Sequence, residues 1–340
     1  MKKQTRHLLH ALREVFLGRR GILKMGQIWL PLSLILFSGS RLAAGSELYA
    51  SLLLLYAVVS KGLSSILFND LTDREIDRRA GKERWITSLP SPVGVLLPVL
   101  LLASGFPVLI MAGGDLPVLA SFTVTAALGV LYSLKPVRFK ERGLWGIAAY
   151  ALAAAILHAL VPWTLFRPAY WLLPLLLCAV TGDKLVQILF HQILDFDSDR
   201  QEKIGSFAVK IGRDKALRIL RFILIFAVAA DAVLLITALF LVSGKFTPFI
   251  WLIGPACLLG ILGAAVYTKI ISKRAGTSTA LTRKLPWPYL GTSYVTFYLL
   301  PPMLLLAIAL RSPEMAILTA LSVLTSLGMS INLFFYSHMK

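Results

Sequence analysis

Residues 48–78 read LYASLLLLYAVVSKGLSSILFNDLTDREIDR, an apolar run followed at once by a highly charged one. Residues 48–69 contain one charged side chain, Lys61, and are long enough for a helix that crosses about 30 Å of hydrocarbon. From Asn69 onward, acidic and basic residues replace the apolar ones. The stretch therefore predicts a membrane-spanning helix that ends in an acidic motif.

The composition of the whole chain also indicates a membrane protein. Of its 340 residues, 57% are hydrophobic and 15% are charged, whereas a soluble domain carries about 25% charged residues. We expect an all-α, polytopic bundle of nine or ten transmembrane helices, formed by a single domain over residues 22–340. A basic amphipathic segment, residues 1–21, is expected to precede it on the membrane surface. The candidate spans are residues 22–41, 48–69, 91–112, 116–133, 144–162, 170–194, 219–243, 248–270, 289–310 and 314–336.

The basic residues predict the orientation of the chain. Lys and Arg total 35 against 17 Asp and Glu, and most of them fall in alternate connections that begin with residues 1–24. Because cytoplasmic loops are enriched in Lys and Arg, both termini and the acidic motifs are expected on the cytoplasmic side of the cell (plasma) membrane. The same bias explains the net charge of +18, so no nucleic-acid partner is expected. Cys178 and Cys257 lie in apolar runs and predict neither a disulfide nor a metal site.

Two acidic motifs each close an apolar run and give the two parts of the chain a similar layout, which hints at an internal pseudo-repeat. Asn69, Asp73 and Asp77 are four residues apart, so a continuing helix would place them on one face over about 12 Å. Asp195 and Asp199 repeat this spacing. Oxygen ligands of this kind suit Mg²⁺ together with substrate phosphates, so all five residues are candidate metal ligands. Solvated loop charges are the alternative, but like charges at this spacing repel one another in both motifs.

Basic residues near the motifs are candidates for binding a diphosphate. Cations of this kind neutralise the charge on a leaving pyrophosphate. Some of them are expected only to follow the cytoplasmic bias of Lys and Arg. Their position in the loop between the motifs favours Lys135 and Arg138. The full set is Lys135, Arg138, Lys140 and Arg142 after the fourth run, and Arg78, Lys82 and Arg84 after the first motif.

Ionisable residues inside the apolar runs are further candidates, because intramembrane charge is costly and tends to face a functional site. Lys61 lies eight residues before the first motif, on the same helical face and two turns deeper. It is expected either to reach a substrate or motif carboxylate, or to pair with Asp183 or Asp231. His191 lies one turn before Asp195 and is a candidate for deprotonating an acceptor, with a structural role as the alternative.

The order of the motifs resembles the UbiA superfamily of intramembrane prenyltransferases. That family carries an N-D-x-x-D-x-x-x-D run after its second helix, a Y-S-x-K loop after its fourth and a D-x-x-x-D run after its sixth. The matching stretches here are NDLTDREID at residues 69–77, YSLK at 132–135 and DFDSD at 195–199. The resemblance implies helices around a central cavity, capped by cytoplasmic loops that bind Mg²⁺ and a prenyl diphosphate.

The motifs and the resemblance together assign roles to individual residues. Tyr132 stands at the family's tyrosine position, where its ring is expected to stabilise an allylic cation or to position the acceptor. The expected catalytic residues are Asp73, Asp77, Asp195, Asp199 and Tyr132, and the expected substrate-binding residues are Asn69, Lys135, Arg138, Lys61, His191 and Arg78.

The implied reaction is Mg²⁺-dependent transfer of an isoprenoid chain from its diphosphate to a lipophilic acceptor within membrane lipid. The acceptor is expected to be aromatic, as in quinone or related lipid biosynthesis. One alternative is a terpene cyclase of the same family, because residues 84–90 (RWITSLP) lack the Arg-Pro pair of many members that act on aromatic substrates. Another is a membrane transporter, which would instead place its acidic residues near the bilayer midplane.

Overall fold

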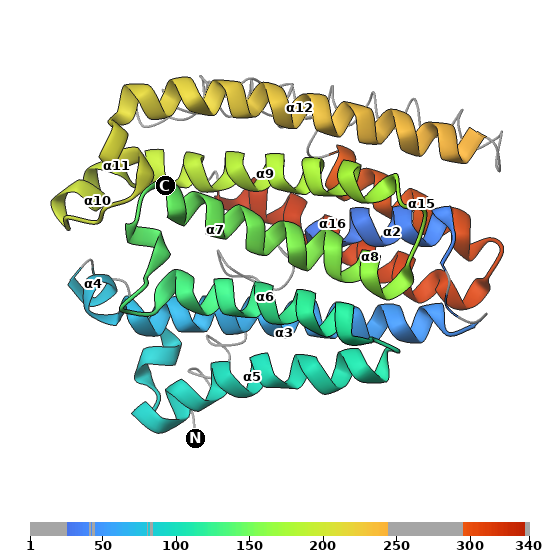
Figure 1. The fold of residues 1–340 in the computed structure, drawn as a ribbon, viewed down its shortest axis with the longest axis horizontal. Helices are drawn as coiled ribbons and strands as arrows, with labels where there is room; N and C mark the ends of the chain where they lie inside the picture. The colour runs from blue at the N-terminus through green and yellow to red at the C-terminus, as the bar shows by residue number, and fades with distance from the viewer. Residues whose placement is uncertain are drawn as a thin grey trace.

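The computed structural model describes residues 26–40, 42, 45–79, 81, 84–243 and 295–336, and the elements within these ranges are helices (Figure 1). The long helices run along the longest dimension of the molecule. The all-α fold class is confirmed. In chain order the elements are η2 (Gly26–Ile28), α2 (Trp29–Ser38), α3 (Glu47–Thr72), α4 (Arg74–Arg79), η3 (Trp85–Ser88), α5 (Ser91–Met111), α6 (Leu116–Ser133), η4 (Phe139–Glu141), α7 (Leu144–Ala155), η5 (Ile156–Leu160), α8 (Val161–Phe166), α9 (Leu172–Leu194), α10 (Phe196–Gln201), α11 (Phe207–Ile211), α12 (Arg213–Ser243), η7 (Val295–Leu299), α15 (Leu300–Ala309), η8 (Pro313–Met315) and α16 (Ala316–Tyr336).

Six helices in the described part of the chain are long and apolar enough to cross a membrane, so the chain is a multi-pass membrane protein. They are Glu47–Thr72, Pro92–Met111, Leu116–Ser133, Leu144–Phe166, Leu172–Leu194 and Arg213–Ala238, and shorter apolar helices lie at Trp29–Ser38, Thr296–Ala309 and Pro313–Leu327. The predicted span 248–270 and the N-terminal segment 1–21 lie outside the described residues. A total of nine or ten spans therefore stays a prediction.

Two helix boundaries differ most from the sequence prediction. The run predicted at 144–162 continues to Phe166, because α7 passes through the π-helical turn η5 into α8. The run predicted at 219–243 begins earlier, at Arg213. The first turns of α12 contain Lys and Arg, which are good helix formers, so the helix extends beyond its apolar part. Apolarity marks the part of a helix that suits hydrocarbon, not the points where the helix starts and stops.

The outer surface of the bundle exposes many large apolar side chains. On α12, the side chains of Phe222, Ile225 and Phe240 are all strongly exposed, whereas Leu54 of α3 and Leu176 of α9 are fully buried. The helix α9 packs against both α7 and α12, and α3 packs against α5 and α6. Because lipid tails are as apolar as leucine, exposed apolar faces need no protein cover, and helix contacts depend on close packing.

Both acidic motifs have the same local construction. The long helix α3 ends at Thr72, and the short helix α4 follows after Asp73. In the same way α9 is followed by Asp195 and then by α10. The amide of Asp77 donates to the Asp73 carbonyl, and that of Asp199 to the Asp195 carbonyl, each at 2.8 Å. Figure 1 places α4 and α10 at the same end of the bundle, which supports the pseudo-repeat that the sequence suggests.

The loop after α6 is joined to the segment after the second motif. The Gly143 amide donates to the Gly205 carbonyl at 3.0 Å, and Gly143 also bridges to Ser206. A Cβ atom on Gly205 would lie 2.5 Å from the Glu141 carbonyl oxygen, so only glycine fits this approach. The connection holds the loop of residues 134–143 between the two motifs.

Replacement of Gly205 by Ala is expected to lower the free energy of unfolding by about 1–3 kcal/mol, because the added methyl group overlaps a backbone atom. The matched control is Gly94→Ala in α5, where a Cβ would make ordinary contacts at 3.6 Å. Thermal unfolding of both detergent-purified variants measures the difference. Equal unfolding midpoints would contradict the close approach of the two segments.

Candidate active site

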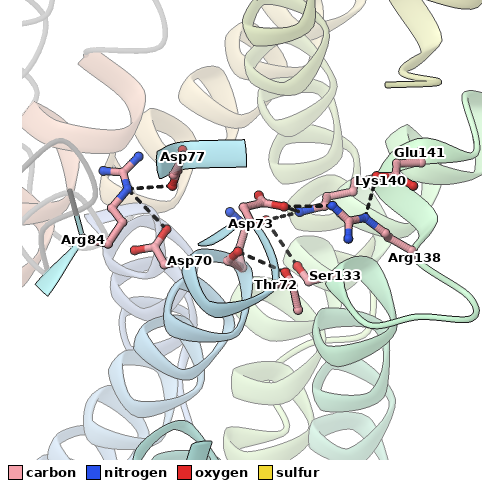
Figure 2. Close-up of polar contacts among 10 residues, drawn as sticks. Asp70, Thr72, Asp73, Asp77, Arg84, Ser133, Arg138, Lys140 and Glu141 are labelled. Atoms are coloured by element: carbon pink, nitrogen blue, oxygen red, sulfur yellow. Dashed lines mark hydrogen bonds and ion pairs between the residues drawn. The ribbon is translucent and has the colours of Figure 1, made fainter. Parts of the chain in front are cut away.

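Two side-chain oxygens of the first motif, from Asn69 and Asp73, accept hydrogen bonds from cations of the loop after α6 (Figure 2). The Lys140 ammonium donates to Asn69 Oδ1 at 2.9 Å and to Asp73 Oδ1 at 2.5 Å. Arg138 Nη2 donates to the same Asp73 oxygen at 2.9 Å. The hydroxyl of Ser133 lies 3.3 Å from Asn69 Oδ1 and donates to it. Asn69 and Asp73 thus share one cation.

The other carboxylates of this motif contact a different cation. Arg84 Nε lies 2.9 Å from Asp77 Oδ2 and 3.9 Å from Asp70 Oδ1. Figure 2 shows Asp70 and Asp77 on the Arg84 side and Asp73 on the opposite side. The single row expected from the four-residue spacing is therefore divided. The cause is that α3 stops before Asp73, whose backbone (φ −97°, ψ 6°) departs from helical geometry.

Burial makes these ion pairs necessary. The Asp70 and Asp77 side chains are 9% and 12% exposed, and a carboxylate shielded to this degree is costly without a cation. The ammonium of Lys140 is similarly shielded. Its burial lowers the pKa of Lys140 below the ordinary value for lysine, and the neighbouring Asp73 carboxylate only partly opposes this shift.

The loop from α6 to η4 turns sharply and brings these cations to Asp73. Arg138 adopts a left-handed backbone conformation (φ 41°, ψ 63°), and its Nε lies 2.6 Å from Glu141 Oε1. Arg142 donates to the carbonyls of Val137 and Pro136. Lys135, at the start of the loop, is exposed and has no polar contact within the described residues. The fold therefore brings Arg138 and Lys140 to the first motif, and it leaves Lys135 outside this network.

The second motif is more open than the first. The side chain of Asp195 is 60% exposed, and its Oδ2 lies 3.8 Å from Nδ1 of His191, which is itself exposed. Asp197 lies 3.4 Å from Arg213, and Asp199 is half-buried. The second motif thus combines accessible carboxylates with few compensating cations.

One ion pair connects the segments that follow the two motifs. Arg79, at the end of α4, lies 3.6 Å from Glu202, which directly follows α10. Both side chains are partly exposed, so the pair adds little stability by itself. Arg78 points elsewhere and pairs with Glu75 at the surface, at 2.9 Å. The pair of Arg79 and Glu202 therefore marks how closely the ends of the two motifs approach.

Tyr132 lies next to the first motif along α6. It precedes Ser133, the residue that donates to Asn69. Its ring centre is 6.0 Å from that of Tyr150 on α7, in a tilted arrangement. A ring contact therefore joins the end of α6 to α7 beside the first motif.

The pairing of Lys61 with Asp183 or Asp231 does not occur in the described structure. The Asp183 carboxylate accepts hydrogen bonds from the amide groups of Gln27 and of Gln187, the latter at 2.6 Å. Asp231 is buried on α12, and neither of its carboxylate oxygens has a hydrogen-bond partner among the described residues. Lys61 is buried as well.

The first motif offers donors that fit Mg²⁺. Within the described ranges no three His, Cys, Asp or Glu side chains are grouped to hold a metal ion. However, the amide oxygen of Asn69 and a carboxylate oxygen of Asp73 already converge on one cation, the ammonium of Lys140. Hard oxygen donors that share a cation in this way are suited to Mg²⁺, which takes few protein ligands and completes its shell with water and phosphate.

Sequence reasoning did not single out several contacts of the site. Glu141 could have been found, because it lies three residues after Arg138 and can pair with it locally. Lys140 rather than Lys135 contacts Asp73 because of the left-handed turn at Arg138, and the sequence does not predict this turn. The same is true of Arg84, which reaches Asp77 only through the turn after α4.

Comparisons with known proteins find a matching family model and several similar solved structures. The model of the UbiA prenyltransferase family matches residues 31–285. A UbiA homologue from Archaeoglobus fulgidus, solved with GPP and Mg²⁺, is 17% identical with a TM-score of 0.52, covering 86% of this chain and 97% of its own. The structure of the same homologue with DMAPP and Mg²⁺ is 17% identical with a TM-score of 0.54. The match covers 84% of this chain and 96% of the homologue. A homologue from Aeropyrum pernix K1 is 15% identical with a TM-score of 0.54. The match covers 88% of this chain and 99% of the homologue.

These structural likenesses establish a shared fold. A comparison with curated protein sequences finds no match. The family match extends over most of the chain and includes both acidic motifs and the loop between them. The chain therefore belongs to the UbiA prenyltransferase family.

Proposed function

We propose that this protein transfers an isoprenoid chain from a prenyl diphosphate to a lipophilic, aromatic acceptor in an Mg²⁺-dependent reaction. The observation that carries the proposal is the position of Arg138 and Lys140, two cations held between two acidic motifs at one end of the bundle. Acidic groups that can hold metal ions and cations that can hold phosphates are both needed to bind a diphosphate. Quinone or related lipid biosynthesis is the expected setting.

The solved relatives support the substrate and the metal. The Archaeoglobus fulgidus homologue is described as bound to GPP and Mg²⁺ in one structure and to DMAPP and Mg²⁺ in another. We infer that this chain binds the same class of prenyl diphosphate. Asn69 and Asp73 would hold Mg²⁺ on one side of it, and Asp195 and Asp199 on the other. Asp77 would join the first pair only by leaving Arg84, with which it pairs in the structure. Bound Mg²⁺ would stabilise the negative charge that develops on the diphosphate.

The cations of the first motif have a second role in this proposal. Arg138 and Lys140 neutralise Asp73 in the structure, and a diphosphate oxygen is an equally good acceptor for both. On substrate binding they exchange the carboxylate for the phosphate groups. Lys135, exposed at the start of the same loop, would contact the outer phosphate, and Arg78 remains a candidate for the same role.

The reaction breaks the bond between C1 of the prenyl chain and the diphosphate oxygen, and both electrons leave with the diphosphate. The acceptor supplies the electron pair for the new bond to C1 and then loses a proton. The ring of Tyr132 would stabilise the allylic cation through its electron-rich face. His191, 3.8 Å from Asp195, would take up the proton.

The positions of the basic loops support a cytoplasmic site in the cell membrane. Arg138 and Lys140 pair with Asp73 and therefore lie at the motif end of the bundle, as expected for a cytoplasmic face. We propose that residues 22–340 form one catalytic domain and that a central cavity holds the prenyl chain.

Substitution of Asp73 or Asp195 by Asn is expected to slow pyrophosphate release at least about 100-fold, because each removes charge that positions the metal and the diphosphate. The assay uses purified protein in nanodiscs with Mg²⁺, geranyl diphosphate and a mixture of lipophilic aromatic acceptors. Asp214→Asn, at an exposed position in the first turn of α12, is the matched control. Full activity in either motif variant, with normal insertion and a monodisperse preparation, would remove the metal-clamp assignment.

Product analysis in the same assay distinguishes the alternatives. A prenylated acceptor identifies the transferase. Pyrophosphate release with a hydrocarbon product and no dependence on acceptor would instead identify a terpene cyclase. The absence of release under all conditions would contradict the enzymatic assignment and favour transport.

Substitution of Lys140 by Met is expected to change two binding affinities in opposite directions: the affinity for the free metal ion and the affinity for the metal with pyrophosphate. Removal of one positive charge within hydrogen-bond distance of Asp73 should strengthen binding of Mn²⁺, as a probe for Mg²⁺, by about tenfold. The same change should weaken binding of Mg²⁺ with pyrophosphate, since a phosphate contact is lost. Mn²⁺ electron paramagnetic resonance and calorimetry measure the two affinities. A change in the same direction for both would contradict the proposed exchange.

A further inference from the structure

The helix α12 has one apolar face that packs against the bundle and another that points outward. Ala216, Leu220 and Leu224 are buried in a core that α12 shares with α9. On the other side, Phe222 and Ile225 are 74% and 69% exposed. Exposed apolar residues continue from there at intervals of three or four, so they form one row along the helix. We refer to this row as the outer stripe: Phe222, Ile225, Ala229, Val233, Ile236 and Phe240.

Three basic residues lie at the start of the outer stripe. Lys215, Arg218 and Arg221 are exposed and follow one another at intervals of three residues, so they are neighbours on the helix surface. None of their side chains has an ion-pair or hydrogen-bond partner among the described residues, and the exposed Asp214 nearby is no exception. We refer to the three as the basic end of α12. Their charge is available to an anion from outside the chain.

The basic end is in register with the outer stripe. Phe222 lies one turn beyond Arg218, and Ile225 lies one turn beyond Arg221. Because helical side chains lean toward the N-terminus, the two guanidinium groups lean away from the stripe and toward water. A general bias of basic residues toward one side of the membrane explains their presence, but not this alignment. A phospholipid has the same order of parts, a charged phosphate followed by hydrocarbon.

The length of the stripe places the basic end at the membrane surface. Arg218 and Phe240 are 22 residues apart, which corresponds to about 33 Å of helix. The hydrocarbon of a bilayer is about 30 Å thick. Trp145 is a second marker, because it is 68% exposed and exposed tryptophan is typical of the membrane interface. It lies two residues after Gly143, which bonds to Gly205 at the motif end of the bundle.

We propose that the basic end and the first residues of the outer stripe bind an anionic phospholipid. Its phosphate would accept hydrogen bonds from Arg218 and Arg221, and Lys215 would add a third positive charge. One acyl chain would lie along the outer stripe from Phe222 onward. A zwitterionic phospholipid would bind less tightly, because it carries a positive group beside its phosphate. The lipid site is separate from the diphosphate site and independent of the proposed prenyl transfer.

A lipid bound at this site would hold the start of α12 beside the second motif. Arg213, the first residue of α12, lies 3.4 Å from Asp197, and its guanidinium carbon lies 5.9 Å from the ring centre of Phe196. Further along, a Cβ atom on Gly182 of α9 would lie 3.1 Å from the Cα atom of Ala227, so α9 and α12 are in close contact. The lipid would therefore bind to a helix that contacts both α9 and α10.

Quenching of tryptophan fluorescence by lipids with brominated acyl chains tests the site locally. Phe222→Trp places a reporter beside the basic end, and Phe240→Trp places a matched reporter at the far end of the same stripe. Both are made in the full chain in phosphatidylcholine nanodiscs, and the signal of the unaltered protein is subtracted. Brominated phosphatidylglycerol is expected to bind beside the Phe222→Trp reporter at least about tenfold more tightly than brominated phosphatidylcholine, because each basic side chain near the surface strengthens the attraction. The Phe240→Trp reporter is expected to show no preference.

Removal of the two arginines tests the origin of the preference. Arg218→Gln with Arg221→Gln, made in the Phe222→Trp chain, is expected to quench equally with the two lipids. Arg74→Gln with Arg200→Gln removes the same charge from exposed positions of α4 and α10, and this matched control should keep the preference. A preference that survives the loss of Arg218 and Arg221 would overturn the proposal.

The two reporters decide between the other occupants of the stripe. Equal quenching of the Phe222→Trp reporter by both lipids would overturn the proposal, because no anionic headgroup is then selected. An equal preference at both reporters would assign the selection to the net charge of the protein and overturn it as well. Quenching by neither lipid would indicate that a second copy of the chain covers the stripe, which also contradicts the proposal. These comparisons hold even if the arginine variant fails to fold.

Discussion

The contact of Asp73 with Arg138 and Lys140 holds together the end of the bundle at which the motifs lie. Asp73 follows α3, while the two cations come from the loop after α6, so one carboxylate joins two distant segments. That loop is in turn fixed to Gly205, beyond the second motif. A partly buried carboxylate without these cations would carry a large desolvation cost. The stability of this end and the placement of its phosphate-binding side chains therefore have the same physical origin.

The two motifs share their backbone construction but differ in their electrostatic surroundings. In both, a long helix stops at an aspartate and a short helix of six residues follows. The first motif is shielded, and its carboxylates are paired with arginine and lysine. In the second, Asp195 is mostly exposed and has only the nearby His191 as a partner in the described structure. The chain thus keeps one half of its candidate diphosphate site neutralised and the other half accessible.

Much of the fold could be predicted because lipid imposes a simple rule on the sequence. The runs 48–69 and 116–133 contain few charges over a length that hydrocarbon requires, and they become α3 and α6. The acidic motifs were visible for a similar reason, since repeated like charges at helical spacing are unfavourable without a cation. The resemblance to the UbiA superfamily also placed Tyr132 and the loop that follows it, and the family match confirms that membership.

The pairing of individual side chains could not be predicted, because it depends on turns and on the rotation of helices. The sequence favoured Lys135, yet the left-handed conformation of Arg138 carries Lys140 to Asp73. The spacing of the first motif suggested one row of ligands, whereas Asp77 turns toward Arg84. Asp183 was a possible partner for Lys61, but Gln27, far away in sequence, reaches it instead.

The most direct test of the account is an experimental structure with Mn²⁺ and a non-hydrolysable prenyl thiolodiphosphate, in which anomalous scattering locates the metal. The account predicts metal ions bound by Asn69 and Asp73 and by Asp195 and Asp199, with Arg138 and Lys140 moved from Asp73 onto the phosphate groups. Metal bound elsewhere, or Lys140 still paired with Asp73 beside a bound diphosphate, would contradict it.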